Sequence, residues 1–155
     1  DPVGRVIQTI ADFGGRDVAT GTIYDTLGRT IAELDARSVR TDYEYDLSGR
    51  LTAVNLPLTT IDDPLNPATQ ISVHPRYEYA YDVYGNQTQI TTNAYLTSDL
   101  QTVVYLKKDA AGVDQVAHSR AIGAPLPAAS LVTATLFTYD EHNRQKSRTL
   151  PDGLV

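Results

Sequence analysis

The chain repeats one short pattern, a Tyr-Asp pair followed after two variable residues by Gly-Arg or a close variant. Four full copies occupy 24–29, 45–50, 81–86 and 139–144, and a fifth copy without the Tyr occupies 1–5. The first two intervals between copies are nearly regular, and the next two are longer. Repeats of this kind bury their surface against neighbouring repeats. We therefore treat residues 1–155 as a single repeat fragment built from short, similar units.

The residues around each copy predict a β-hairpin. Before the turn, aromatic and polar residues alternate, as in Tyr43-Glu44-Tyr45, which is the pattern of a strand with one packed face. After the turn come β-branched and apolar residues, as in 51–54, which favour a returning strand. Consecutive hairpins of this kind form a continuous antiparallel strip. We therefore expect an all-β fold of consecutive antiparallel hairpins.

The motif itself predicts a type I turn followed by a residue with positive φ. Aspartate at the start of a turn accepts hydrogen bonds from nearby backbone N–H groups, and Gly adopts positive φ without a Cβ clash. Asn143 stands where the other copies have Gly, and Asn is among the few other residues that tolerate this conformation. Arg is not explained by the turn, because Asn86 replaces it in one copy. The residues expected to carry the structural motif are Tyr24, Asp25, Gly28, Arg29, Tyr45, Asp46, Gly49, Arg50, Tyr81, Asp82, Gly85, Tyr139, Asp140, Asn143 and Arg144.

Two proline-rich segments interrupt the repeat. The segment 56–75 contains four prolines, and proline this dense is incompatible with a central strand. We therefore expect an inserted loop between the second and third full copies. The segment 122–129, with two further prolines, is expected to be a second insertion.

Weaker signals mark the remaining turns. Asp109 and Gly112 keep the spacing of the motif within 108–113, although Lys replaces Tyr, so this segment is a candidate degenerate copy. The segment 113–122 fits either a loop or a strand. A second turn in each hairpin is indicated at 12–15, 34–38 and 150–153.

Charge and composition restrict the classes of partner. The chain has 13 Lys and Arg against 19 Asp and Glu, for a formal charge of −6, and the basic residues are scattered. Nucleic-acid binding depends on clustered basic side chains, so we expect no nucleic-acid partner. No apolar stretch approaches the roughly 20 residues that span a bilayer, so we expect no membrane span. Cysteine is absent, which excludes disulfides and thiolate chemistry.

The repeated motifs closely resemble the YD repeat of bacterial Rhs proteins, which also occurs in the B and C components of insecticidal toxin complexes and in animal teneurins. The resemblance runs from Asp1 to Gly153 and is weak between Tyr95 and Leu131. It implies a long β-strip that spirals into a hollow shell, commonly around a C-terminal toxic effector. By this resemblance the chain is a non-catalytic segment of a secreted or cell-surface shell, with the rest of the shell and the enclosed effector as its partners. Because it begins with Asp1 and has no basic-then-apolar leader, we expect a piece of a longer chain.

A different class of function remains open for the tyrosines. Aromatic rings suit sugar binding, so the alternative is a module that binds carbohydrate or a cell surface. A Tyr that recurs at one position in every hairpin is more simply explained by packing across strands. Tyr84 lies within a turn and outside the repeated position, which makes it the better ligand-binding candidate.

The polar residues predict neither a metal site nor an enzyme. Calcium needs six to eight oxygens in one place, whereas the repeated aspartates lie a hairpin apart. His74, His118 and His142 share no ligand spacing and have no acid or nucleophile at a repeated offset. The sequence also lacks a phosphate-binding Gly-rich loop. We therefore expect no cofactor, no metal and no catalytic residues.

Overall fold

The computed structural model describes residues 1–12, 17–129 and 132–151, and it places no α-helix among them. Contacts divide the chain into two units, residues 1–57 and residues 58–155, which we describe separately. Within both units, each strand pairing is antiparallel. The expected all-β fold of antiparallel hairpins is therefore confirmed. The described residues contain no helix long and apolar enough to cross a membrane.

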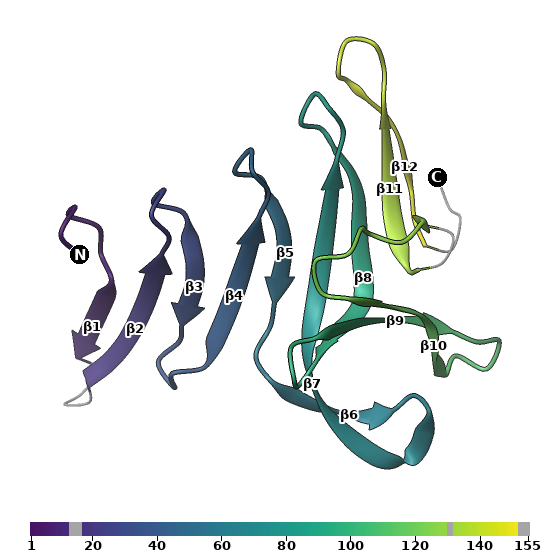
Figure 1. Cartoon of the computed structure of the whole chain (residues 1–155), viewed down its shortest axis with the longest axis horizontal. Coiled ribbons are helices and arrows are strands. Elements are labelled where there is room, and N and C mark those ends of the chain that lie inside the picture. Colours follow the sequence, from purple (N-terminus) through teal and green to yellow (C-terminus); the bar gives the residue numbers. More distant parts are fainter. Residues whose placement is uncertain (13–16, 130–131, 152–155) are drawn as a thin grey trace. The chain divides into compact units, whose positions relative to one another are not determined.

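The first unit is a meander in which each strand pairs with the next one along the chain. Figure 1 shows these strands side by side, with the turns of the three motif copies at the same end of the strands. Its strands are β1 (Gln8–Asp12), β2 (Asp17–Tyr24), β3 (Thr30–Leu34), β4 (Arg40–Tyr45) and β5 (Leu51–Asn55).

This first unit has very little hydrophobic core. Among its described apolar residues, only Ala32 and Ala53 are buried, and both are completely inaccessible. A single-layer sheet gains stability mainly from its backbone ladder and from side-chain pairs between adjacent strands. Contacts that link one hairpin to the next are therefore unusually important here.

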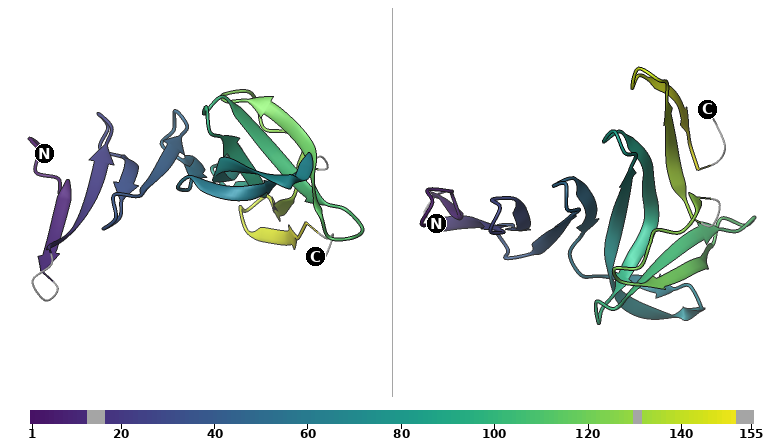
Figure 2. Two further views of the ribbon diagram at one scale, coloured as in Figure 1. Left: turned by 90° about the horizontal axis from the view of Figure 1, so that it is seen from below. Right: turned by 45° about the horizontal axis from the view of Figure 1, so that its top comes forward.

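The second unit contains the remaining strands, and β8 is the point at which its sheet branches. Residues 94–96 of β8 pair with β9, whereas residues 89–91 pair with β11. The hairpins β9–β10 and β11–β12 consequently leave β8 in different directions (Figure 2). The strands are β6 (Thr59–Asp63), β7 (Asn66–Tyr81), β8 (Gln87–Thr97), β9 (Thr102–Lys108), β10 (Asp114–Ala121), β11 (Ala134–Tyr139) and β12 (Gln145–Thr149).

The core of the second unit lies on both faces of β9. Val103 and Tyr105 belong to a cluster that includes residues of β8 and β11. Val104 and Leu106, on the opposite face, belong to a cluster with residues of β7 and β8. Successive strand residues point to opposite faces, so the apolar run of β9 is buried on both sides.

The expectation of a loop throughout 56–75 is wrong, because β6 and the first half of β7 form a hairpin there. Two of the prolines lie where no ladder N–H is required. Pro64 lies in the hairpin turn, and Pro67 lies in an irregular stretch without a strand partner. Pro75 lies beyond the last pair that β7 makes with β6, at Val73, and is paired with Tyr95 of β8.

The other irregular segments are distributed as follows. Residues 122–129 connect β10 to β11 without forming a strand, and the open assignment of 113–122 is decided in favour of a strand, β10. The turn expected at 34–38 is present, with Ser38 at a φ of 62°. The turns expected at 12–15 and 150–153 lie largely outside the described residues.

Candidate functional site: a side-chain ladder between hairpin turns

Every motif copy forms the same turn, of which the copy at 24–29 is representative. The Asp25 Oδ1 atom accepts hydrogen bonds from the backbone N–H groups of Leu27 and Arg29, both at 2.9 Å. The Asp25 Oδ2 atom accepts one from Arg29 Nε at 2.6 Å. The backbone closes the turn, since Asp25 N–H donates to the Arg29 carbonyl at 2.9 Å. The aspartate thus fixes both the loop and the direction of the arginine side chain.

The fourth residue of the turn has positive φ, as the sequence predicted. Gly49 has a φ of 81°, and Asn143, which replaces Gly in the last copy, has a φ of 58°. The strand register shifts by one residue at the Tyr of each full copy. A bulge of this kind is typical of a type I turn followed by a residue in the left-handed region.

The hydrogen bonds of the turn hold its aspartate in the charged form. The Arg50 backbone N–H and guanidinium lower the pKa of Asp46 against the opposing effect of partial burial. Burial raises the pKa of Asp25, but the Arg29 hydrogen bonds and charge outweigh it and leave the pKa lowered. The pKa values of Asp82 and Asp140 are lowered by equivalent contacts, led by the Asn86 side chain and the Arg144 backbone N–H respectively.

The arginine of the first copy reaches the turn of the second. The Arg5 guanidinium carbon lies 4.6 Å from the centroid of the Tyr24 ring, and Arg5 Nη1 donates to the Asp25 carbonyl at 3.2 Å. In return, the Tyr24 hydroxyl donates to the Val6 carbonyl at 2.9 Å. The Tyr of one hairpin is therefore held by the Arg, and by the residue after the Arg, of the preceding hairpin.

The second and third copies repeat this arrangement atom for atom. The Arg29 guanidinium lies 4.9 Å from the Tyr45 ring centroid, and its Nη1 donates to the Asp46 carbonyl at 3.1 Å. The Tyr45 hydroxyl donates to the Thr30 carbonyl at 2.8 Å. We call this recurring set of contacts the turn ladder. Its contacts are the same in both places although the variable loop residues differ.

A variant of the turn ladder joins the copies at 81–86 and 139–144 in the second unit. The Tyr139 hydroxyl donates to the Gln87 carbonyl at 2.8 Å, as in the other copies. Asn86 stands in place of Arg, and its Nδ2 donates to Asp82 Oδ2 at 2.9 Å and to Asn143 Oδ1 at 3.1 Å. An amide contact thus replaces the contact between arginine and aromatic ring.

The comparison with known families agrees with this geometry. The family model of the RHS Repeat matches residues 24–61, the segment that contains the contact between Arg29 and Tyr45. Residues 24–61 are an Rhs-type repeat. Comparison with curated proteins found no match.

The Rhs-type signature acquires a role for each of its residues from the turn ladder. Tyr and Arg link neighbouring hairpins, Asp caps the turn and orients Arg, and Gly or Asn supplies positive φ. Packing across strands therefore describes only part of what the tyrosines do. The role of Arg was missed because the sequence does not show which hairpins are neighbours. Tyr84 takes no part in the ladder, and its side chain points outward, with the residue 77% exposed.

The segment 108–113, outside the matched repeat, has the same turn. The Asp109 Oδ1 atom accepts hydrogen bonds from the N–H groups of Ala111 and Val113, and Gly112 has a φ of 80°. Lys108 occupies the Tyr position and donates to the Gly112 carbonyl at 3.2 Å. The segment therefore keeps the turn and lacks the ladder tyrosine.

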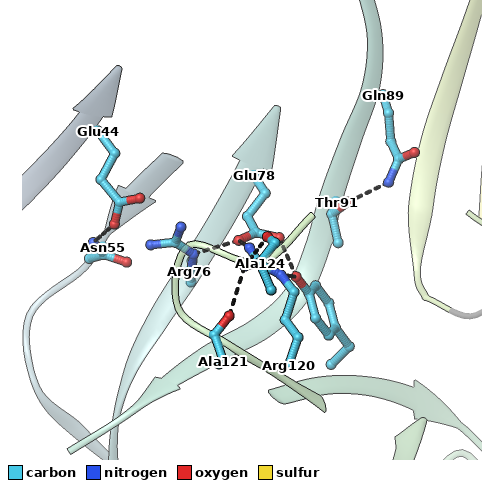
Figure 3. Close-up of polar contacts among 10 residues, drawn as sticks. Glu44, Asn55, Arg76, Glu78, Gln89, Thr91, Arg120, Ala121 and Ala124 are labelled. Atoms are coloured by element: carbon cyan, nitrogen blue, oxygen red, sulfur yellow. Dashed lines mark hydrogen bonds and ion pairs between the residues drawn. The ribbon is translucent and has the colours of Figure 1, made fainter. Parts of the chain in front are cut away.

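A buried ionic cluster in the second unit gave no signal in the sequence. Glu78, which is completely buried, accepts hydrogen bonds at Oε1 from Arg76 Nε, at 2.7 Å, and from Arg120 Nη2 (Figure 3). Its Oε2 accepts one from the Tyr105 hydroxyl at 2.5 Å. Arg120 Nε also donates to the Tyr105 oxygen at 2.6 Å. All the polar atoms of this glutamate are therefore paired.

The same cluster holds the connection between β10 and β11. Arg120 Nη1 donates to the Ala124 carbonyl at 2.7 Å and to the Ala121 carbonyl at 3.2 Å (Figure 3). Burial is the main reason that the pKa of Tyr105 is raised, and its hydrogen bond to Glu78 adds to the effect. Among the residues that the structure describes, no group of three His, Asp or Glu side chains is placed to hold a metal ion.

Proposed function

We propose that this Rhs-type chain is a non-catalytic structural segment of a secreted toxin shell that encloses a C-terminal effector. The turn ladder carries this proposal. It joins successive hairpins by contacts that do not involve the variable loop residues, so the same contacts place each further hairpin beside the preceding one. A long wall built from one small repeating unit requires contacts that recur in this way.

The thin first unit supports the same proposal. Its described residues bury few apolar side chains, and a sheet this thin depends on neighbouring elements for its stability. The partners of the segment are therefore the remainder of the shell and the enclosed effector. Secretion of the whole protein belongs to the same proposal.

Limited proteolysis of the complete natural protein tests this function. If the repeats form a wall, the domain that follows them resists protease while the wall is intact. Arg29→Gln combined with Tyr45→Leu removes one rung of the turn ladder and is expected to expose that domain to cleavage. Leu47→Ala, at a fully exposed turn residue, is the matched control and leaves protection unchanged. Rapid cleavage of the following domain in the unmodified protein would contradict the proposal.

A specific observation favours carbohydrate or cell-surface binding as the second candidate function. Tyr84 lines a hollow of about 320 Å³ together with Tyr139 and the carboxylates of Asp82, Asp140 and Glu141. An exposed aromatic ring beside hydrogen-bonding carboxylates suits a sugar ring. Glycan-array binding that is lost in Tyr84→Ala and retained in Leu47→Ala would support this candidate. An array without signal, from a protein with native strand content, would exclude it.

A further inference from the structure

A hollow in the second unit lies between the β6–β7 hairpin and the start of β10, away from the turn ladder. Its volume is about 460 Å³, within the range of about 300–1,000 Å³ that is usual for small-molecule sites. Apolar side chains form one part of its wall and carboxylates form another. The residues that matter here are Val73, Tyr95, Leu106, Asp62, Asp63 and Asp114.

Tyr95 lines this pocket with a ring that carries one polar atom. The residue is only 6% exposed, and its ring packs in the core with Val73 and Leu106. Its hydroxyl has no hydrogen-bond partner among the residues that the structure describes, whereas each fully buried side-chain polar atom there has one. The hydroxyl must therefore reach solvent, and the pocket is the solvent-filled space beside the ring. Burial and, secondarily, the charge of Asp63 raise the pKa of Tyr95, so the hydroxyl stays protonated.

Each carboxylate of the pocket is anchored through one oxygen. Asp63 Oδ1 accepts a hydrogen bond from the Leu65 N–H at 2.8 Å, and Asp62 Oδ1 accepts one from a glutamine side chain at 3.2 Å. Asp114 Oδ1 accepts one from Asn93 Nδ2 at 3.0 Å. The Oδ2 atoms of the three aspartates make no hydrogen bond within the described part of the chain. Each carboxylate is therefore held in position by one oxygen, and its other oxygen can accept a further hydrogen bond.

Nearby cations neutralise this charge only in part. Arg76 also lines the pocket, but its guanidinium is paired with the buried Glu78 carboxylate at 2.7 Å. Lys108 lies 3.2 Å from Asp114, and its side chain is largely exposed. An exposed ion pair of this kind contributes little to stability, so the lysine is easily displaced by a competing cation.

We propose that this pocket binds a primary alkylammonium group. The ammonium group has three N–H donors and no acceptor, which matches the carboxylate oxygens and the Tyr95 hydroxyl oxygen. The attached methylene chain fits against the apolar wall of Val73 and Leu106. The ligand is either a free diamine or a lysine side chain of a polypeptide, because both present the same chemistry. This binding is independent of the role of the turn ladder.

Titration of the isotope-labelled chain, followed by amide NMR shifts, tests the proposal. The probes are 1,5-diaminopentane, Nα-acetyl-lysine N-methylamide with its ε-ammonium group free as the polypeptide form, and 1,5-pentanediol as the neutral control. We expect saturable shifts at residues 93–95 with at least one of the two amines and none with the diol. Saturation by the diamine alone identifies a free amine as the ligand, and saturation by the lysine derivative identifies a polypeptide.

Two conservative variants and one control complete the test. Tyr95→Phe removes only the hydroxyl and Asp63→Asn removes only the charge, and each is expected to weaken binding by at least about threefold, since hydrogen bonds to charged groups are among the stronger ones. Asp17→Asn changes the net charge equally at an exposed residue that lines neither this pocket nor the hollow beside Tyr84 and leaves the affinity unchanged. The absence of saturable shifts with both amines, equal shifts with the diol, or unchanged affinity in both pocket variants would overturn the proposal.

Discussion

Asn86 and Asn143, which both depart from the repeated signature, form a hydrogen bond with each other, from Nδ2 to Oδ1 at 3.1 Å. One replaces the ladder Arg and the other replaces the positive-φ Gly, and the two residues are 57 positions apart in the chain. The copy that lacks the Arg contact therefore has an amide contact to the neighbouring turn in its place. Within each unit, neighbouring motif turns are therefore joined by side-chain contacts.

This contact predicts coupling between the two asparagines. Asn143→Gly improves the backbone conformation but removes the acceptor of Asn86, so the two effects oppose each other. Asn86→Ala removes the donor, and in the double variant the second substitution has no bond left to break. We expect a coupling free energy of about 0.5–1 kcal/mol, the usual net value of a neutral hydrogen bond. Hydrogen exchange of the Asp140 amide, which closes the second turn, measures it, and strictly additive effects would refute it.

The positive φ of Gly49 predicts a steep dependence on side-chain type. No atom lies within 4 Å of a Cβ added there, so any loss of stability reflects the backbone alone. Gly49→Val is expected to destabilise the turn by more than about 1 kcal/mol, because β-branched residues are disfavoured at positive φ. Gly49→Asn should cost clearly less, since Asn143 occupies the same position. Equal effects of Val and Asn on urea unfolding would show that φ is not the cause.

The turn aspartates predict a loss of stability in acid. Their pKa values in the folded chain are lowered relative to about 3.9 in an unfolded chain. Their contribution is therefore complete above that unfolded value and is lost as the pH falls through the lowered folded values. Asp46→Ala should be less stable than the parent chain at pH 6 and should lose less stability between about pH 5 and pH 2. Identical pH profiles of urea unfolding for the two proteins would contradict this assignment.

The ionic cluster predicts an asymmetric response to substitution. Glu78→Leu leaves the Arg76 and Arg120 guanidinium groups without their shared buried partner and is expected to destabilise the second unit by about 3–5 kcal/mol. Arg148→Met, at an exposed arginine of β12, should change stability by less than about 0.5 kcal/mol. Thermal unfolding compares the two variants. A Glu78→Leu effect as small as that of the control would show that the cluster does not hold the fold.

The sequence predicts local features of this chain well, because they depend on residues close together. Asp, Gly and the strand alternation specify each turn and hairpin. Asn143 identifies the positive-φ position, because it replaces Gly there and is one of the few other residues that tolerate this conformation. The ladder role of Arg29 could not be predicted in this way, since its partner Tyr45 belongs to another hairpin. The pairing of Glu78 with Arg120 likewise joins residues distant in the sequence. Proline content predicts 56–75 poorly, because it does not reveal whether a ladder N–H is required at each proline.

A double-mutant cycle on Arg29 and Tyr45 tests the turn ladder most directly. Arg29→Gln, Tyr45→Leu and their combination are compared through hydrogen exchange of the Asp25 and Asp46 amides, which close the two turns. Arg29→Gln with Tyr24→Leu, within one motif copy, is the control pair. We expect a coupling free energy of about 0.5–1 kcal/mol between Arg29 and Tyr45, as for an exposed cation–π contact, and a smaller value for the control. Additive effects of Arg29 and Tyr45, or equal coupling in the two pairs, would contradict a ladder that joins one hairpin to the next.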